Sequence, residues 1–186
     1  MAKRLCPVWV GYLLASPLRK LIQNPKKILG PHVKEGMMVL DIGCAMGFFS
    51  LPLAQMVGTD GEVLCVDVQE KMIKSLEKRA QKTGLSNRIE THKCHTNSLG
   101  LENHKEKIDF ALAFAVIHEV ADASRLLSEI YTMIKPTGRF LIAEPKGHIS
   151  KEDFEMTVSI AEQNGFHVID KPRIGRSHVV LLEKKE

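Results

Sequence analysis

Two short apolar runs, each ending at an acid, constrain the fold of this chain most strongly. The first is residues 38–42, which include Asp41 and lead into a loop of small residues. The second is residues 63–68, which include Asp67. Parallel strands need a long crossover connection, usually a helix, and the spacing between the two runs provides one. The runs therefore predict a βαβ unit with two acids at the carboxyl ends of neighbouring parallel strands.

The alternation of strand and helix patterns continues along the chain. Short helical pieces are expected at 17–22 and 25–29, and longer helices at 49–57, 69–83, 123–134 and 151–163. Further strands are expected near 88–93 and at 108–114, 139–144, 166–170 and 178–182. A turn is predicted at 135–138, and the last two strands are close enough in sequence to pair antiparallel. The pattern predicts an α/β fold.

Length and composition favour one compact domain. The chain has 186 residues, of which 44% are hydrophobic and 26% are charged, as in ordinary globular proteins. We divide it into an N-terminal helical cap or arm, residues 1–36, and a main domain, residues 37–186. The four cysteines show no spacing typical of a metal site, so no metal is expected.

The arm is basic, with seven Lys or Arg residues and one acid. Such an arm suits an acidic substrate, a lipid headgroup or RNA, or is simply a solvated face. We expect no nucleic-acid partner and keep a transient membrane-surface contact open. Pro7, Gly11 and Pro17 interrupt the signal-like start, which favours a cytoplasmic protein.

The loop after the first strand argues against a dinucleotide. A G-x-G-x-x-G motif would need glycines where Ala45 and Phe48 stand, although Gly43 and Gly47 are present. Asp41 would also repel a pyrophosphate at the mouth of this loop, whereas an ammonium group would be attracted there. A ligand with a cationic amino-acid end, a ribose and an adenine fits these demands.

From about residue 37 to residue 144 the sequence resembles the class I S-adenosylmethionine-dependent methyltransferases. Their first motif reads roughly D-x-G-x-G-x-G, which Asp41, Gly43 and Gly47 match while Ala45 replaces the middle glycine. The resemblance implies a three-layer, Rossmann-like α/β sandwich with a mostly parallel seven-stranded sheet and an antiparallel C-terminal strand. It also implies S-adenosylmethionine as cofactor and in-line methyl transfer. Without an inserted substrate domain, the short N-terminal cap is the main cover for the acceptor, which favours a small or partly apolar acceptor.

The resemblance implies roles for particular residues. Asp67 would hold the ribose hydroxyls, the alternative being a helix cap. His95 stands where the family often has an acid facing the adenine, and Ala45 is tolerable if its backbone has an ordinary conformation. The cofactor-binding set is Asp41, Gly43, Cys44, Ala45, Gly47, Phe48, Asp67, Val68, His95, Thr96, Phe114 and Ala115.

His118 and Glu144 are the candidate catalytic residues. Each follows or ends a predicted strand at the edge where ligands gather, and an imidazole suits deprotonation of an acceptor. The alternatives are a hydrogen bond within the loop for His118 and bonds to backbone amides for Glu144. Two other functions stay open, a nicotinamide-dependent oxidoreductase on a related fold and a non-catalytic module that binds S-adenosylmethionine.

Overall fold

The computed structural model describes residues 7, 9, 11, 19 and 23–185, and these belong to two compact units. The N-terminal unit extends to Cys94 and the C-terminal unit begins at His95. The described residues contain seven strands, mostly parallel, with antiparallel pairing towards the C-terminus. The predicted α/β, Rossmann-like class is confirmed, while the division into an arm and a main domain stays a prediction.

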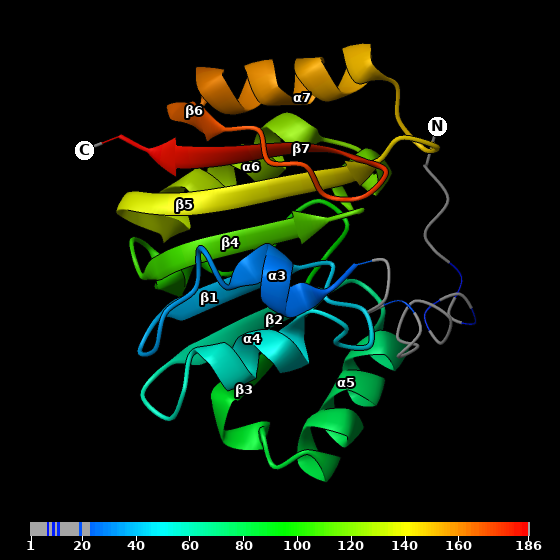
Figure 1. Cartoon of the computed structure of the whole chain (residues 1–186), viewed down its shortest axis with the longest axis vertical. Coiled ribbons are helices and arrows are strands. Elements are labelled where there is room, and N and C mark those ends of the chain that lie inside the picture. Colours follow the sequence, from blue (N-terminus) through cyan, green and yellow to red (C-terminus); the bar gives the residue numbers. More distant parts are fainter. Residues whose placement is uncertain (1–6, 8, 10, 12–18, 20–22, 186) are drawn as a thin grey trace. The chain divides into compact units, whose positions relative to one another are not determined.

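The N-terminal unit is built on three parallel strands in the order β3-β2-β1. Its helix α4 packs on β2, and α5 packs on β2 and β3 (Figure 1). The interiors of β1 and β2 are fully buried because they consist of branched apolar residues. The elements are α3 (Pro25–Leu29), β1 (Met38–Ile42), α4 (Ser50–Met56), β2 (Glu62–Asp67), α5 (Glu70–Lys82), η1 (Ser86–Arg88) and β3 (Ile89–Lys93).

The C-terminal unit has four strands in the order β4-β5-β7-β6. β4 and β5 are parallel, whereas β7 runs antiparallel to both of its neighbours. α6 and α7 pack against each other and against this part of the sheet (Figure 1). The elements are η2 (Glu102–His104), β4 (Ile108–Phe114), η3 (Ile117–Glu119), α6 (Ala123–Met133), β5 (Ile134–Pro145), α7 (Lys151–Gln163), β6 (Phe166–Asp170) and β7 (Ser177–Lys184).

The predicted elements hold except at the start of β5. The expected helix 123–134 stops at Met133, and the expected turn at 135–138 lies inside β5. Thr137 has a φ of +62°, and the register shifts between the Ile108 and Phe110 pairs, so the turn residues form an irregularity within the strand. The helical piece expected at 17–22 lies almost wholly outside the described residues.

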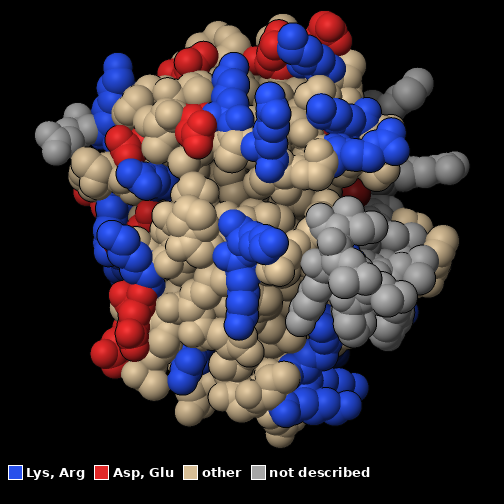
Figure 2. Space-filling view, viewed as in Figure 1, with Lys and Arg blue, Asp and Glu red and all other residues tan. Residues whose placement is uncertain are grey.

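Charge on the surface is mixed. Figure 2 shows Lys and Arg side chains spread over the visible face, with acids among them. Lys26, Lys27 and Lys34 belong to the basic arm and are described, whereas half of the arm is not. The expected membrane-surface contact therefore stays a prediction. Within the described ranges, no helix is long and apolar enough to cross a membrane.

Candidate functional site

Asp41 is the buried acid of the N-terminal unit. It lies near the end of β1, is 3% exposed, and accepts a 2.6 Å hydrogen bond from the Ser50 hydroxyl at the start of α4. Burial raises the pKa of Asp41 from 3.8 to about 7, with a smaller upward contribution from Asp67. The Ser50 hydrogen bond and the Arg19 charge act in the opposite direction. Because burial disfavours the charged form of Asp41, a cationic ligand group beside it would stabilise the carboxylate.

The loop after β1 is fixed by backbone hydrogen bonds and by glycine. The amides of Gly43 and Cys44 both donate to the Val66 carbonyl, at 2.9 and 3.0 Å. Gly47 has a φ of +82°, and a Cβ there would lie 2.3 Å from Leu76 Cδ1. Glycine is therefore required at this position both for the backbone conformation and for the close approach of α5.

Gly47→Ala is expected to destabilise the protein by roughly 2–4 kcal/mol, because the left-handed conformation and the clash with Leu76 add together. Gly84→Ala is the matched control, since Gly84 has a φ of +69° but open space around its Cβ position. It should lose only about 1 kcal/mol. Urea unfolding measures both changes, and equal losses in the two variants would contradict the close packing described here.

Ala45 corrects one expectation. Alanine in place of the motif's glycine was expected to be tolerable if its backbone conformation were ordinary. The φ of Ala45 is +47°, so this condition is not met. A non-glycine residue in the left-handed region is strained, and strain of this kind collects at functional loops. The Ala45 amide donates a 3.0 Å hydrogen bond to Asp67 Oδ2, which helps to hold the strained residue.

Asp67 ends β2 and joins two segments of the N-terminal unit. Besides the Ala45 amide it accepts a 2.8 Å hydrogen bond from the Gln69 amide on Oδ1. Burial is the main cause that raises its pKa. An ionised carboxylate has about four acceptor sites, so acceptor capacity remains for a diol. The alternative role of Asp67 as a helix cap is not adopted, because Gln69 occupies the cap position of α5 and Asp67 bonds to the amide of Gln69 rather than to an amide of the helix. Val68, the next residue, is half-buried.

In the C-terminal unit, Glu144 and His118 form a close pair. Glu144 lies near the end of β5 with its side chain fully buried, and its Oε2 is 2.5 Å from His118 Nδ1. Its Oε1 accepts the amide hydrogens of Val116 and Ile117, at 3.2 and 2.7 Å. Glu144 therefore makes the expected backbone bonds and also orients the imidazole, whose side chain keeps 16% exposure.

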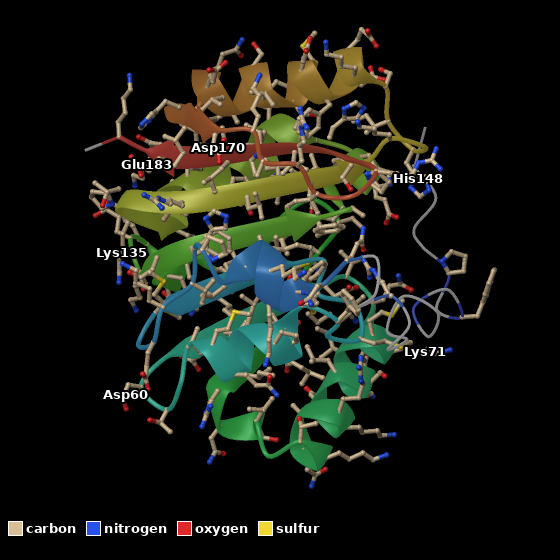
Figure 3. All side chains as sticks on the ribbon, viewed as in Figure 1. Asp60, Lys71, Lys135, His148, Asp170 and Glu183 are labelled. Carbon is tan, nitrogen blue, oxygen red and sulfur yellow. The ribbon has the colours of Figure 1, made fainter. Side chains whose placement is uncertain are left out.

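The other predicted residues of this unit divide into two groups. Phe114 is buried at the end of β4, and Ala115 follows with a φ of +60° and an amide bonded to the Ala143 carbonyl at 2.8 Å. His95 and Thr96 are exposed, and His95 takes part in a tight turn with Ser98. The His148 ring lies edge-on to that of His118, with centroids 5.2 Å apart, and His148 is labelled in Figure 3.

Sequence reasoning missed two residues beside Asp41. Ser50 lies three residues after Gly47, where a hydroxyl is an unremarkable helix-start residue. Arg19 belongs to the arm and lies over the Phe48 ring, with its Cζ atom 4.2 Å from the ring centroid. The only sequence signal for Arg19 was the basic character of the arm.

The N-terminal unit fits the head and sugar of S-adenosylmethionine. Its buried acid carries a raised pKa, Gly47 leaves no side chain on the loop at its position, and Asp67 retains acceptor capacity. A pyrophosphate would instead add negative charge beside Asp41 and Asp67. Across the part of the chain that is described, no group of three or more His, Cys, Asp or Glu side chains is arranged to hold a metal ion.

The methyltransferase domain family model matches residues 33–179, which is most of the chain. The chain belongs to this methyltransferase family. The predicted family and its cofactor, S-adenosylmethionine, are thereby confirmed. This chain is 28% identical to a SAM-dependent methyltransferase from Aquifex aeolicus, with a TM-score of 0.85 and coverage of 96% of this chain and 99% of that one.

Other relatives are more distant. The ubiquinone/menaquinone biosynthesis C-methyltransferase of Edwardsiella ictaluri is 26% identical over 144 residues, which are 77% of this chain and 54% of that protein. The methyltransferase domain thus spans about half the length of the curated relatives it matches. A SAM-dependent O-methyltransferase from Thermotoga maritima shares the fold at 20% identity, with a TM-score of 0.70 and coverage of 88% and 65% of the two chains.

Proposed function

We propose that this chain transfers the methyl group of S-adenosylmethionine to a small, partly apolar acceptor that loses a proton, and that His118 takes this proton. The observation that carries the proposal is the 2.5 Å contact between His118 Nδ1 and the buried Glu144 carboxylate. A histidine oriented by a buried acid is the arrangement of a general base. A methyl donor alone does not require one.

Glu144 determines which ring nitrogen is available. Because its Oε2 lies at Nδ1, we assign the proton of neutral His118 to Nδ1 and the uptake of a proton to Nε2. The amides of Val116 and Ile117 hold the carboxylate in place. We therefore assign proton transfer to His118 and a positioning role to Glu144. Glu119 Oε1 lies 4.0 Å from Nε2 and would stabilise the imidazolium.

Donor binding is assigned to the N-terminal unit. Asp41 would attract the ammonium group, Asp67 would accept the ribose hydroxyls, and the loop from Gly43 to Phe48 would pass along the ligand. S-adenosylmethionine, when bound, supplies an already activated methyl group. The protein then needs to align the reactants, keep water out and accept one proton, without a covalent enzyme intermediate.

The acceptor class follows from the base. A neutral imidazole can assist loss of a proton from a phenol, quinol, enol or thiol. The curated relatives are named for a C-methylation in ubiquinone and menaquinone biosynthesis, which is compatible with a quinol-like acceptor. We place small aromatic hydroxyl compounds first among the candidates and expect no nucleic-acid substrate.

The test is transfer of label from methyl-labelled S-adenosylmethionine to a panel of phenols, quinols, thiols and carboxylic acids. Both tRNA and protein are tested as acceptors in the same way. The expected result is one labelled class of small acidic hydroxyl compound and release of S-adenosylhomocysteine. Labelling of tRNA or protein instead would contradict the proposed acceptor. Tight binding of S-adenosylhomocysteine without turnover of any acceptor tested would favour the non-catalytic module.

A further inference from the structure

Two described residues of the arm contact the part of the N-terminal unit to which donor binding is assigned. Gly11 is buried, and a Cβ built on it would lie 2.8 Å from Met72 Sδ and 3.0 Å from Met46 Cε. The arm backbone at Gly11 therefore packs closely against the Met46 side chain of the loop after β1 and the Met72 side chain of α5. Arg19 is the second such residue, and its guanidinium covers the Phe48 ring.

The Arg19 guanidinium is held in place by several contacts. Its Cζ atom is 4.2 Å from the Phe48 centroid and 5.4 Å from the Phe49 centroid, within the range of a cation–π interaction. Its Nε donates a 2.7 Å hydrogen bond to Gln23 Oε1. Burial lowers the pKa of Arg19 to about 10, so the group stays protonated at neutral pH, and it interacts electrostatically with Asp41.

The proposed donor carries an ammonium and a carboxylate on the same carbon atom. Asp41 suits the ammonium, but Asp41 and Asp67 together would repel the carboxylate. A cation that interacts with Asp41 removes this conflict. The ligand's ammonium can then pair with Asp41, and its carboxylate can pair with the cation. We propose that Arg19 binds the carboxylate of the donor's amino-acid end, so that the arm is part of the donor site. This inference rests on the proposed function.

Among the described residues, Arg79 is a second arginine that contacts the loop, and it is less suited to this role. Its Nη1 donates to the Met46 carbonyl, so it supports the loop backbone. Burial alone accounts for the lowering of its pKa, with no contribution from a carboxylate, whereas Arg19 interacts with Asp41. Arg19 is therefore the better candidate, because it interacts electrostatically with the acid that would receive the ammonium and lies on the loop at Phe48.

The experiment compares two ligands that differ only in the carboxylate. Calorimetry measures binding of S-adenosylmethionine and of decarboxylated S-adenosylmethionine to the full chain and to Arg19→Gln. The affinity for S-adenosylmethionine is expected to fall about 10- to 100-fold, because a charge-assisted hydrogen bond is lost. The affinity for the decarboxylated ligand should stay the same or rise, since Arg19 repels its ammonium.

Two further variants guard against a folding defect. Arg19→Lys keeps the charge and should restore part of the affinity for S-adenosylmethionine. Arg88→Gln removes an arginine of the same unit that donates to the Ala54 carbonyl, and it should leave both affinities unchanged. An equal loss for both ligands in Arg19→Gln, or no loss for S-adenosylmethionine, overturns the inference. If the unaltered chain binds neither ligand, the donor assignment itself fails, and the inference fails with it.

Discussion

Asp41→Asn is expected to make the ligand-free protein more stable at pH 8 and to remove most of its donor affinity. The folded protein holds this carboxyl at a pKa of about 7 because burial disfavours its charge, whereas its ordinary value is 3.8. Asparagine is neutral and its side-chain oxygen can still accept the Ser50 hydrogen bond. The substitution therefore removes a buried charge and keeps the local contact.

The sign of the pH dependence follows from the raised pKa. Between about pH 4 and pH 7 the folded state binds more protons at Asp41 than the unfolded state, so stability falls as the pH rises. The penalty is complete above pH 7 and amounts to roughly 4 kcal/mol at most. Thermal unfolding should show Asp41→Asn above the unaltered protein at pH 8, with the difference shrinking towards pH 4.

Ligand binding should show the opposite effect in the same variant. S-adenosylhomocysteine is expected to raise the melting temperature of the unaltered protein and to have little effect on Asp41→Asn, because the ammonium loses its counter-charge. Asp60→Asn is the control, since Asp60 is an exposed acid of the same unit, labelled in Figure 3. If Asp41→Asn keeps the full ligand-induced shift, the proposed role of Asp41 is wrong.

Glu144→Gln is expected to lower kcat by about 10²- to 10⁴-fold while leaving S-adenosylhomocysteine binding unchanged. The glutamine amide would donate where the Oε2 atom of Glu144 accepts, so the proton of neutral His118 would move to Nε2, which could then no longer act as the base. The measurement is turnover of the acceptor identified by label transfer. Nitrogen NMR of His118 reports the change of tautomer without any acceptor.

The matched control is Glu183→Gln on β7. Glu183 pairs with Arg139 at 3.2 Å in the same unit, but it lies at a part-exposed position (Figure 3). This variant should keep its kcat within about twofold, because exposed ion pairs contribute little. His118→Asn should be as slow as Glu144→Gln, and turnover within about threefold of the unaltered protein in both would contradict a base at His118.

Local sequence patterns predicted the strands and the loop well. Asp41, Gly43 and Gly47 stand at the end of a buried strand, and both the alternation of elements and the glycines are local signals. The bounds of α7 and β6 were predicted to the residue, with Asn164 and Gly165 as the signal for the end of α7. At the start of β5, pairing with β4 prevailed over the turn signals at 135–138.

Side-chain partners across long sequence separations could not be predicted in this way. Glu144 and His118 are 26 residues apart, and their contact depends on the register of β5 beside β4. Arg19 meets Phe48 through the path of the arm, which has no repeating pattern. The positive φ of Ala45 could not be predicted either, because an alanine carries no sequence signal for a positive φ.

The two amide hydrogens accepted by Asp67 have a kinetic consequence. They tie the loop at Ala45 to the start of α5 at Gln69 before any ligand arrives. The chain has therefore already lost the corresponding conformational entropy during folding, and little is left to lose on association. Donor capture should then proceed at an ordinary bimolecular rate, so that variants of this loop differ mainly in the lifetime of the complex.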